Sequence, residues 1–312
     1  MIDTLNFKLH CSQFDRNKIV DILERKTTVK SQTDYGDHKS IVANYKNYKI
    51  ILGDSYLTIS GSLTKLHYGN NLQQLTFMQV QDLILHFEEF LEMSLNDAEI
   101  TRIDLACNIE VDKPISQYLN LFTSPDGYKS RIYESETTYF ESSKEKLIFY
   151  DKGKELQSKQ DRIIIGNERK NILRYEISVK KDIASVLNWA DAKLENLHNY
   201  HDYIAVLKRF ISAYRSLPIH TEPLPSQLIY DSVTAFKNSL ITEGIRSMGG
   251  VQALNAAIKQ ASMKKEVKHN IRKFINTLPP GQIISAELKN ELDAKILAIC
   301  KQEVYKASEW SD

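Results

Sequence analysis

Four side chains in this 312-residue chain have the types and spacing needed to cut a phosphodiester bond. Asp104 ends the segment ITRID, and Glu176 interrupts the segment NILRYEI. Apolar strands rarely carry an acid unless its charge is paired or binds a cation. Tyr150 stands two residues before Lys152 in IFYDKGKEL. Because a tyrosine can form a covalent bond to phosphorus while carboxylates hold a metal ion beside the phosphate, this set predicts phosphodiester chemistry.

The two acids each follow an arginine at a spacing of two residues. Side chains alternate along a strand, so Arg102 shares a face with Asp104, and Arg174 shares a face with Glu176. Two such strands could present their carboxylates side by side, which suits a hard cation such as Mg²⁺ or Mn²⁺. The alternative is a pair of arginine–carboxylate ion pairs on a solvated or interface face, since structural ion pairs are common.

Tyr150 requires activation before it can act as a nucleophile, because a phenol titrates near pH 10. If the segment is a strand, Lys152 lies on the same face and could favour the phenolate or protonate the leaving oxygen. The alternative is an ordinary strand tyrosine, since the chain contains 16 tyrosines.

The elements around these residues predict an α+β fold. Thr76 and Gln79 have the spacing of a capping box at the start of an amphipathic helix through Met93. We expect strands at 2–10, 45–52, 56–61 and 99–110 and within 131–151 and 163–181, and helices at 14–25, 115–122 and from 182 onward. The predicted architecture is a mixed, mostly antiparallel sheet with flanking helices in residues 1–217, followed by a smaller all-helical part in residues 218–312.

Composition narrows the class of protein. The net charge is +1, so any nucleic-acid binding must depend on local basic patches. The three cysteines are widely spaced, which favours a reducing compartment. No apolar stretch approaches the roughly 20 residues of a membrane helix, and no P-loop motif is present. We therefore expect a cytoplasmic protein without helicase activity of its own.

Three motifs follow one another in the chain: ITRIDLA, FYDKGKEL and LRYEISVK. In this order they resemble the replication-initiation proteins of filamentous phages, which are the gene II products and the wider phage replication protein CRI family. They resemble more distantly the initiators of staphylococcal rolling-circle plasmids. The resemblance covers about residues 1–181 and includes the segments MIDTL, GSLTKLHYGNN and SETTYFESSKEKLIFYDKGKEL.

This resemblance implies an endonuclease and strand transferase that starts rolling-circle replication in a bacterial host cytoplasm. Such a protein nicks one strand at an origin, stays joined to the 5′-phosphate through tyrosine, leaves a 3′-OH for the host polymerase, and later rejoins the strand. Carried onto this chain, the nucleophile falls on Tyr150 and the metal positions on Asp104 and Glu176. Lys152 and Glu155 fall on the invariant part of the tyrosine motif, where Glu155 could bind metal, act as a base or pair with Lys152. Residues 1–217 would then be the nickase domain.

Histidine is a departure from many rolling-circle nucleases, which hold their metal with a His-x-His pair. This chain has no such pair, and the phage-type initiators lack it too. His67, beside Asn70 and Asn71, is the candidate for a contact with the site or with DNA. His198 and His201 are expected on a helical surface.

Two basic regions could contact DNA. Residues 129–181 contain thirteen Lys or Arg against nine Asp or Glu, and residues 246–276 contain seven against Glu266 alone. In the second region Lys265, Lys268 and Arg272 recur at helical spacing, which predicts a phosphate-binding stripe on a DNA-binding or accessory part that could also dock a host helicase. A solvated helix face is the alternative.

Two other functions remain compatible with the sequence. An origin-binding initiator or repressor would keep the basic patches without cutting DNA. A metal-dependent nuclease that uses water would cut DNA without a covalent intermediate.

Overall fold

The protein is described by a computed structural model that covers residues 1–35, 38–119, 121–133, 137–158, 171–219, 232–234, 236–237, 240–241, 258, 264–277 and 285–308. Part of the predicted strand region (163–170) and the predicted helix breaks at 249–250 and 279–281 lie outside these residues.

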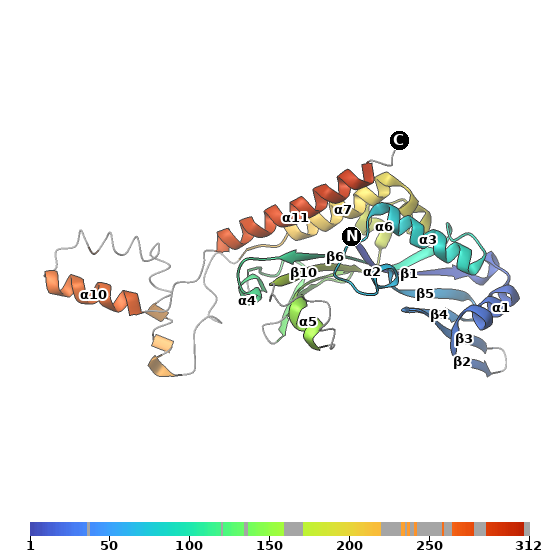
Figure 1. Ribbon diagram of the computed structural model, residues 1–312, viewed down its shortest axis with the longest axis horizontal. Coiled ribbons are helices and arrows are strands. Elements are labelled where there is room, and N and C mark those ends of the chain that lie inside the picture. Colours follow the sequence, from blue (N-terminus) through green and yellow to red (C-terminus); the bar gives the residue numbers. More distant parts are fainter. Residues whose placement is uncertain are drawn as a thin grey trace. The chain divides into compact units, whose positions relative to one another are not determined.

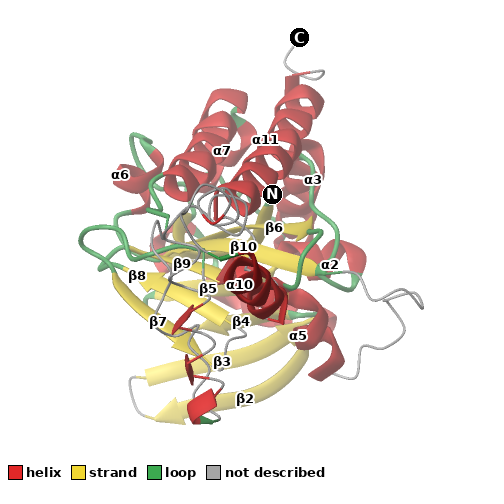
Figure 2. Cartoon of the chain, turned by 90° about the vertical axis from the view of Figure 1, so that its left-hand side faces the viewer, coloured by secondary structure: helices red, strands yellow, loops and turns green. Residues whose placement is uncertain are grey.

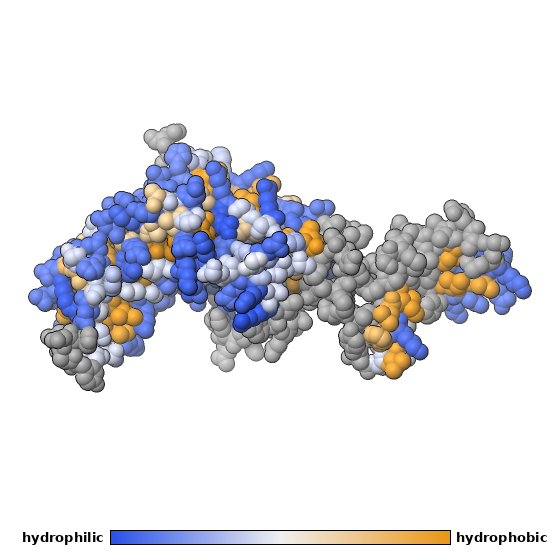
Figure 3. Space-filling model, turned by 180° about the vertical axis from the view of Figure 1, so that it is seen from behind, coloured by the Kyte–Doolittle hydropathy of each residue, from blue (hydrophilic) through white to orange (hydrophobic). Residues whose placement is uncertain are grey.

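The chain forms two compact units. The first contains Met1–Pro218 together with Glu291–Asp312, and the second contains Ile219–Asn290. Residues from Glu291 onward, which the sequence analysis grouped with the C-terminal part, thus pack with the first unit. In the rear view, hydrophilic residues form much of the surface of the first unit, with smaller hydrophobic areas between them (Figure 3).

The first unit is built on one ten-stranded sheet in the order β2-β3-β4-β5-β1-β6-β10-β9-β8-β7 (Figure 1). Every neighbouring pair of strands is antiparallel. The strands are β1 (Ile2–His10), β2 (Thr28–Tyr35), β3 (His38–Tyr45), β4 (Tyr48–Leu52), β5 (Tyr56–Ser62), β6 (Glu99–Glu110), β7 (Lys129–Tyr133), β8 (Thr137–Glu141), β9 (Glu145–Asp151) and β10 (Ile172–Val179). The predicted α+β class with a mostly antiparallel sheet is confirmed.

One face of this sheet is covered by helices. Helices α3, α7 and α11 lie on the same side of the strands in both ribbon views (Figures 1 and 2). The helices are α1 (Arg16–Lys26), α2 (Leu63–Tyr68), α3 (Phe77–Leu91), α4 (Ile115–Leu119), α5 (Lys152–Ser158), α6 (Ile183–Leu187), α7 (Tyr200–Arg215), α10 (Lys265–Thr277) and α11 (Ser285–Ser308), with 3-10 turns η1 (Cys11–Gln13) and η2 (Leu194–His198). In the described part of the chain, no helix is long and apolar enough to cross a membrane.

The covered face is the hydrophobic core. Phe149 of β9 stacks on Tyr175 of β10, with ring centroids 4.7 Å apart, and Tyr175 lies 4.7 Å from Phe210 of α7. All three side chains are fully buried. The predicted capping box of α3 is present, since Thr76 accepts from Gln79 N and Gln79 accepts from Thr76 N. The apolar stripe of α3 is buried, as its spacing predicts.

The opposite face carries the polar residues of the same strands. On β4 and β5 the residues alternate strictly, so that Leu57 and Ile59 are buried while Thr58 and Ser60 are partly exposed. We call this surface the open face. It is the face on which the candidate functional residues lie.

Two local predictions differ from the structure. Residues 28–45 form the hairpin β2–β3, which the sequence analysis did not predict, and β4 begins at Tyr48 because Tyr45 belongs to β3. Lys152 was expected on a strand beside Tyr150, but β9 ends at Asp151 and Lys152 is the first residue of α5.

Candidate active site on the open face

Both predicted arginine–acid pairs form on the open face. Arg102 donates to Asp104 from Nε at 2.9 Å and from Nη2 at 2.6 Å, and Arg174 donates from Nε to Glu176 at 3.2 Å. Their strand neighbours Ile103 and Tyr175 point into the core. The alternation expected from the sequence is therefore confirmed for β6 and β10.

The register of three neighbouring strands sets the site. Tyr150 of β9 lies directly opposite Arg174 of β10, and Ser178 of β10 lies directly opposite Asp104 of β6. Glu176 is therefore the diagonal neighbour of both Tyr150 and Asp104, a relation that separates residues by about 7–8 Å. A line of Tyr150, Glu176 and Asp104 thus crosses β9, β10 and β6 on one face.

Arg174 holds this site together. Its side chain is almost fully buried and donates from Nη2 to Asp3 Oδ2 at 2.5 Å and from Nη1 to the backbone oxygen of Asn71 at 3.0 Å, in addition to its bond with Glu176. Burial tends to lower the pKa of Arg174, but the carboxylates of Asp3 and Glu176 raise it, so the guanidinium stays charged. Its predicted role as a direct DNA contact would require displacement of these partners.

Asp3 is a site residue that the sequence analysis missed. It stands at a register shift between β1 and β6, and it also accepts from Ser62 Oγ at 3.0 Å. The signal was an acid inside the alternating strand MIDTLNFKLH. Its partner lies 171 positions away in the chain, so only the fold reveals the pairing.

Lys152 and Asn71 anchor the start of α5 to the sheet. The Lys152 side chain is fully buried, and its Nζ donates to Asn71 Oδ1 at 2.7 Å and to Glu155 Oε2. The same Nζ lies 5.9 Å from the centre of the Tyr150 ring. Of the options left open for Glu155, the structure contains the ion pair with Lys152.

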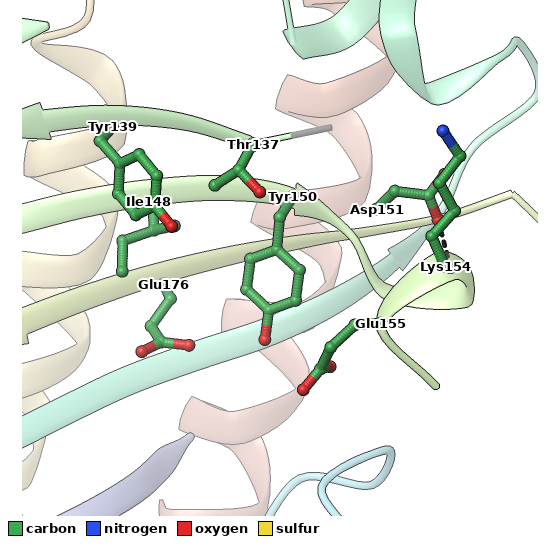
Figure 4. Close-up of a pocket in the computed structure, with 8 residues that line it drawn as sticks. All are labelled: Thr137, Tyr139, Ile148, Tyr150, Asp151, Lys154, Glu155 and Glu176. Carbon is green, nitrogen blue, oxygen red and sulfur yellow. Dashed lines mark hydrogen bonds between the residues drawn. The ribbon is translucent and has the colours of Figure 1, made fainter. Parts of the chain in front are cut away.

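A pocket of about 410 Å³ opens beside Tyr150. Figure 4 shows the Tyr150 hydroxyl between the carboxylates of Glu176 and Glu155. The pocket is lined by Thr137, Tyr139, Ile148, Tyr150, Asp151, Lys154, Glu155 and Glu176. Tyr139, on β8, is the other tyrosine of this lining.

The electrostatic environment keeps the Tyr150 phenol protonated. Burial raises the pKa of Tyr150 above its usual value, Arg174 lowers it, and Glu176 and Glu155 raise it further. Burial also raises the pKa of Glu176, against the effect of Arg174, and the charges of Asp104 and Asp3 add to the increase. A phenol with a high pKa therefore lies beside a carboxylate whose proton affinity is increased, which is the arrangement of a nucleophile and a proton acceptor.

The donor atoms of the site suit a hard divalent cation. Asp3, Asp104 and Glu176 carry three negative charges against the two positive charges of Arg102 and Arg174, which leaves a net charge of −1 at a place where a phosphate would bind. Among the described residues, no three His, Cys, Asp or Glu side chains are already arranged as a metal site. A cation would therefore use carboxylate oxygens that now accept from arginine.

His67 does not reach the other candidate residues through any contact in the described part of the chain. It is exposed on α2, where its Nε2 lies 3.1 Å from Gln79 Nε2. The segment KLHYGNN contributes to the site through Asn71 instead. In the second unit, Lys265, Lys268 and Arg272 lie on α10, where Lys265 is exposed and Lys268 partly exposed.

The fold and the site define a class of protein: an α+β protein that presents a tyrosine, acids and arginines on the uncovered face of an antiparallel sheet. Residues 1–204 match the phage CRI family, which is described by the N-terminal part of a phage replication-associated protein. The match covers more than half of the 312 residues, and the chain belongs to this family. The family is one of phage replication initiators, for which DNA is the expected partner. The comparison with curated proteins found no match.

Proposed function

We propose that the protein nicks one strand of DNA at a replication origin through a covalent bond between Tyr150 and the 5′-phosphate, and later religates that strand. The observation that carries this proposal is the diagonal of Tyr150, Glu176 and Asp104 beside an open pocket. Family membership supports it, because an initiator of rolling-circle replication must generate a 3′-OH primer.

The proposed reaction exchanges one oxygen on phosphorus for another. The bond between Tyr150 Oη and phosphorus forms while the bond between phosphorus and the 3′ oxygen breaks, which leaves a 3′-OH end. The phenol loses a proton and the 3′ oxygen gains one, so the step is balanced without a further reactant. Glu176 and Glu155 flank the phenol, and either carboxylate can accept the proton and return it to the leaving oxygen (Figure 4).

Lys152 acts as a positioning residue in this proposal. Its ammonium is buried and already bound to Asn71 and Glu155, so it is poorly placed to protonate the leaving oxygen. By fixing Glu155 at the first turn of α5, Lys152 holds one wall of the pocket beside Tyr150.

Mg²⁺ or Mn²⁺ would be held by Asp104 and Glu176, with Asp3 adjacent. When bound, the ion would offset the charge that develops on the phosphate. Isothermal titration of Mn²⁺ into the DNA-free protein tests this directly, with an expected loss of binding in Asp104→Ala and Glu176→Ala. Unchanged titration curves in both variants would rule out this metal site.

The function itself is tested with labelled single-stranded DNA tiled from the origin of the encoding replicon, incubated with Mn²⁺ and separated on a denaturing gel. A protein–DNA adduct that disappears in Tyr150→Phe supports the proposal. Cleavage without an adduct would instead indicate hydrolysis by water. Binding with neither product would indicate the alternative function, a non-cleaving initiator or repressor.

A further inference from the structure

The open face extends beyond the pocket across four further strand positions. Arg102 of β6 lies opposite Asn6 of β1, Asn6 lies opposite Ser60 of β5, and Ser60 lies opposite Lys49 of β4. This row, Arg102–Asn6–Ser60–Lys49, has a cation at each end, an amide and a hydroxyl between them, and no acid. Three gaps between strands give it a span of about 14 Å.

Arg102 connects the row to the candidate active site. Its Nε and Nη2 bind Asp104, while its Nη1 has no hydrogen-bond partner within the described residues. Its side chain is 35% exposed, whereas that of Asp104 is 2% exposed. The guanidinium thus has two N–H groups available at the edge of the site.

Lys49, at the other end, is exposed and forms no ion pair in the described part of the chain. It stands on a strand face where a solvated lysine has no packing role, so it is available to a phosphate group.

An exposed aromatic ring lies along the same face. Tyr56, at the start of β5, is 42% exposed and lies opposite His10 of β1. Lys8 Nζ is 4.9 Å from the centre of the Tyr56 ring, and the His10 ring packs edge-on against it at 5.3 Å. The tyrosine is therefore held in place by neighbours while much of its side chain remains open to solvent.

We propose that this surface, formed by Arg102, Asn6, Ser60, Lys49 and Tyr56, binds the unpaired DNA strand that leads to or from the scissile phosphate. The inference rests on the proposed function and adds the path of its substrate. Proteins that bind single strands combine cations along the backbone with aromatic rings on which bases stack. A duplex would offer its phosphates but not a free base face to Tyr56. At a spacing of ~3.4 Å per nucleotide, the row accommodates about four nucleotides.

The test measures binding of fluorescein-labelled single-stranded origin DNA by anisotropy, in the non-cleaving Tyr150→Phe background. Tyr56→Ala with Lys49→Gln should weaken affinity by about tenfold or more and reduce the salt slope by about 0.7, the value for one phosphate contact. The matched control is Tyr305→Ala with Lys301→Gln, an exposed tyrosine and lysine on α11, which lies on the covered side of the sheet. Tyr56→Phe, which keeps the ring, should retain affinity.

Equal affinities for the Tyr56 and Tyr305 double variants would overturn the inference, even if wild-type protein forms the adduct. An equal loss of duplex binding would also overturn it, because the surface would then not select unpaired DNA. If wild-type protein forms no adduct but affinity still depends on Tyr56 and Lys49, the proposed function fails and the binding surface stands. Thermal midpoints that match those of the parent protein verify that each variant is folded.

Discussion

The two faces of the central sheet carry opposite kinds of residue on the same strands. Phe149 is fully buried and stacks on Tyr175, whereas its neighbour Tyr150 points to the pocket on the other side. Ile103 and Arg102 show the same contrast on β6. The covered face supplies the burial that stabilises the fold, so the open face can carry charges whose arrangement costs stability.

This comparison explains why the site is rigid without being apolar. Arg174 is buried but satisfied by Asp3, Glu176 and Asn71, so its charge is compensated on the open face. Removing a partner would leave a buried charge without compensation, which is usually strongly destabilising. The site and the fold are therefore linked through Arg174 more than through Tyr150.

The largest expected effect separates the faces by chemistry. Tyr150→Phe removes the proposed nucleophile and keeps the ring, so adduct formation should fall on the order of a thousandfold or more. The thermal midpoint should change little, because the ring contacts remain. The measurements are a denaturing gel and a thermal melt. Tyr139→Phe, in the same pocket, is the control and should retain adduct formation.

The next effect tests the covered face on the same strand. Phe149→Ala should lower the free energy of unfolding by about 3–5 kcal/mol, because it opens a cavity against Tyr175. Urea denaturation provides the measurement. A loss below ~1 kcal/mol would contradict the division into a stabilising and a chemical face.

A smaller effect concerns pH. The pKa of Glu176 is raised in the folded protein above the usual value of 4.5, so the folded state keeps this proton at a pH where the unfolded state has lost it. Stability from this group is fully present below pH 4.5 and declines as pH rises through the raised pKa. Compared with Glu176→Gln, the parent protein should therefore lose stability over this window. Parallel stability–pH curves for the two proteins would show that the Glu176 pKa is unshifted.

The smallest effect is expected in the second unit. Reversal of charge at Lys265, Lys268 and Arg272 should reduce the salt slope of origin-duplex binding by about two to three, as expected for loss of up to three phosphate contacts. Fluorescence anisotropy over a range of salt concentrations provides the measurement. Unchanged affinity and slope would assign another role to α10.

The sequence predicted the parts of the site that depend on local periodicity. Strand 99–110 has the predicted bounds, and alternation placed Arg102 with Asp104 and Arg174 with Glu176. It did not predict the pairing of Asp3 with Arg174 or the role of Asn71, because these contacts join segments distant in the chain. Lys152 was assigned to a strand because apolar alternation continues up to Phe149, and the periodicity contains no sign of the helix start after Asp151.

The central claim is that the phenol of Tyr150 becomes bonded to DNA. The most direct measurement is mass spectrometry of the protease-digested adduct formed on single-stranded origin DNA. The account predicts a 5′-phosphonucleotide on the peptide that contains Tyr150. A modification on Tyr139 or elsewhere, or complete cleavage with no modified peptide, would contradict it.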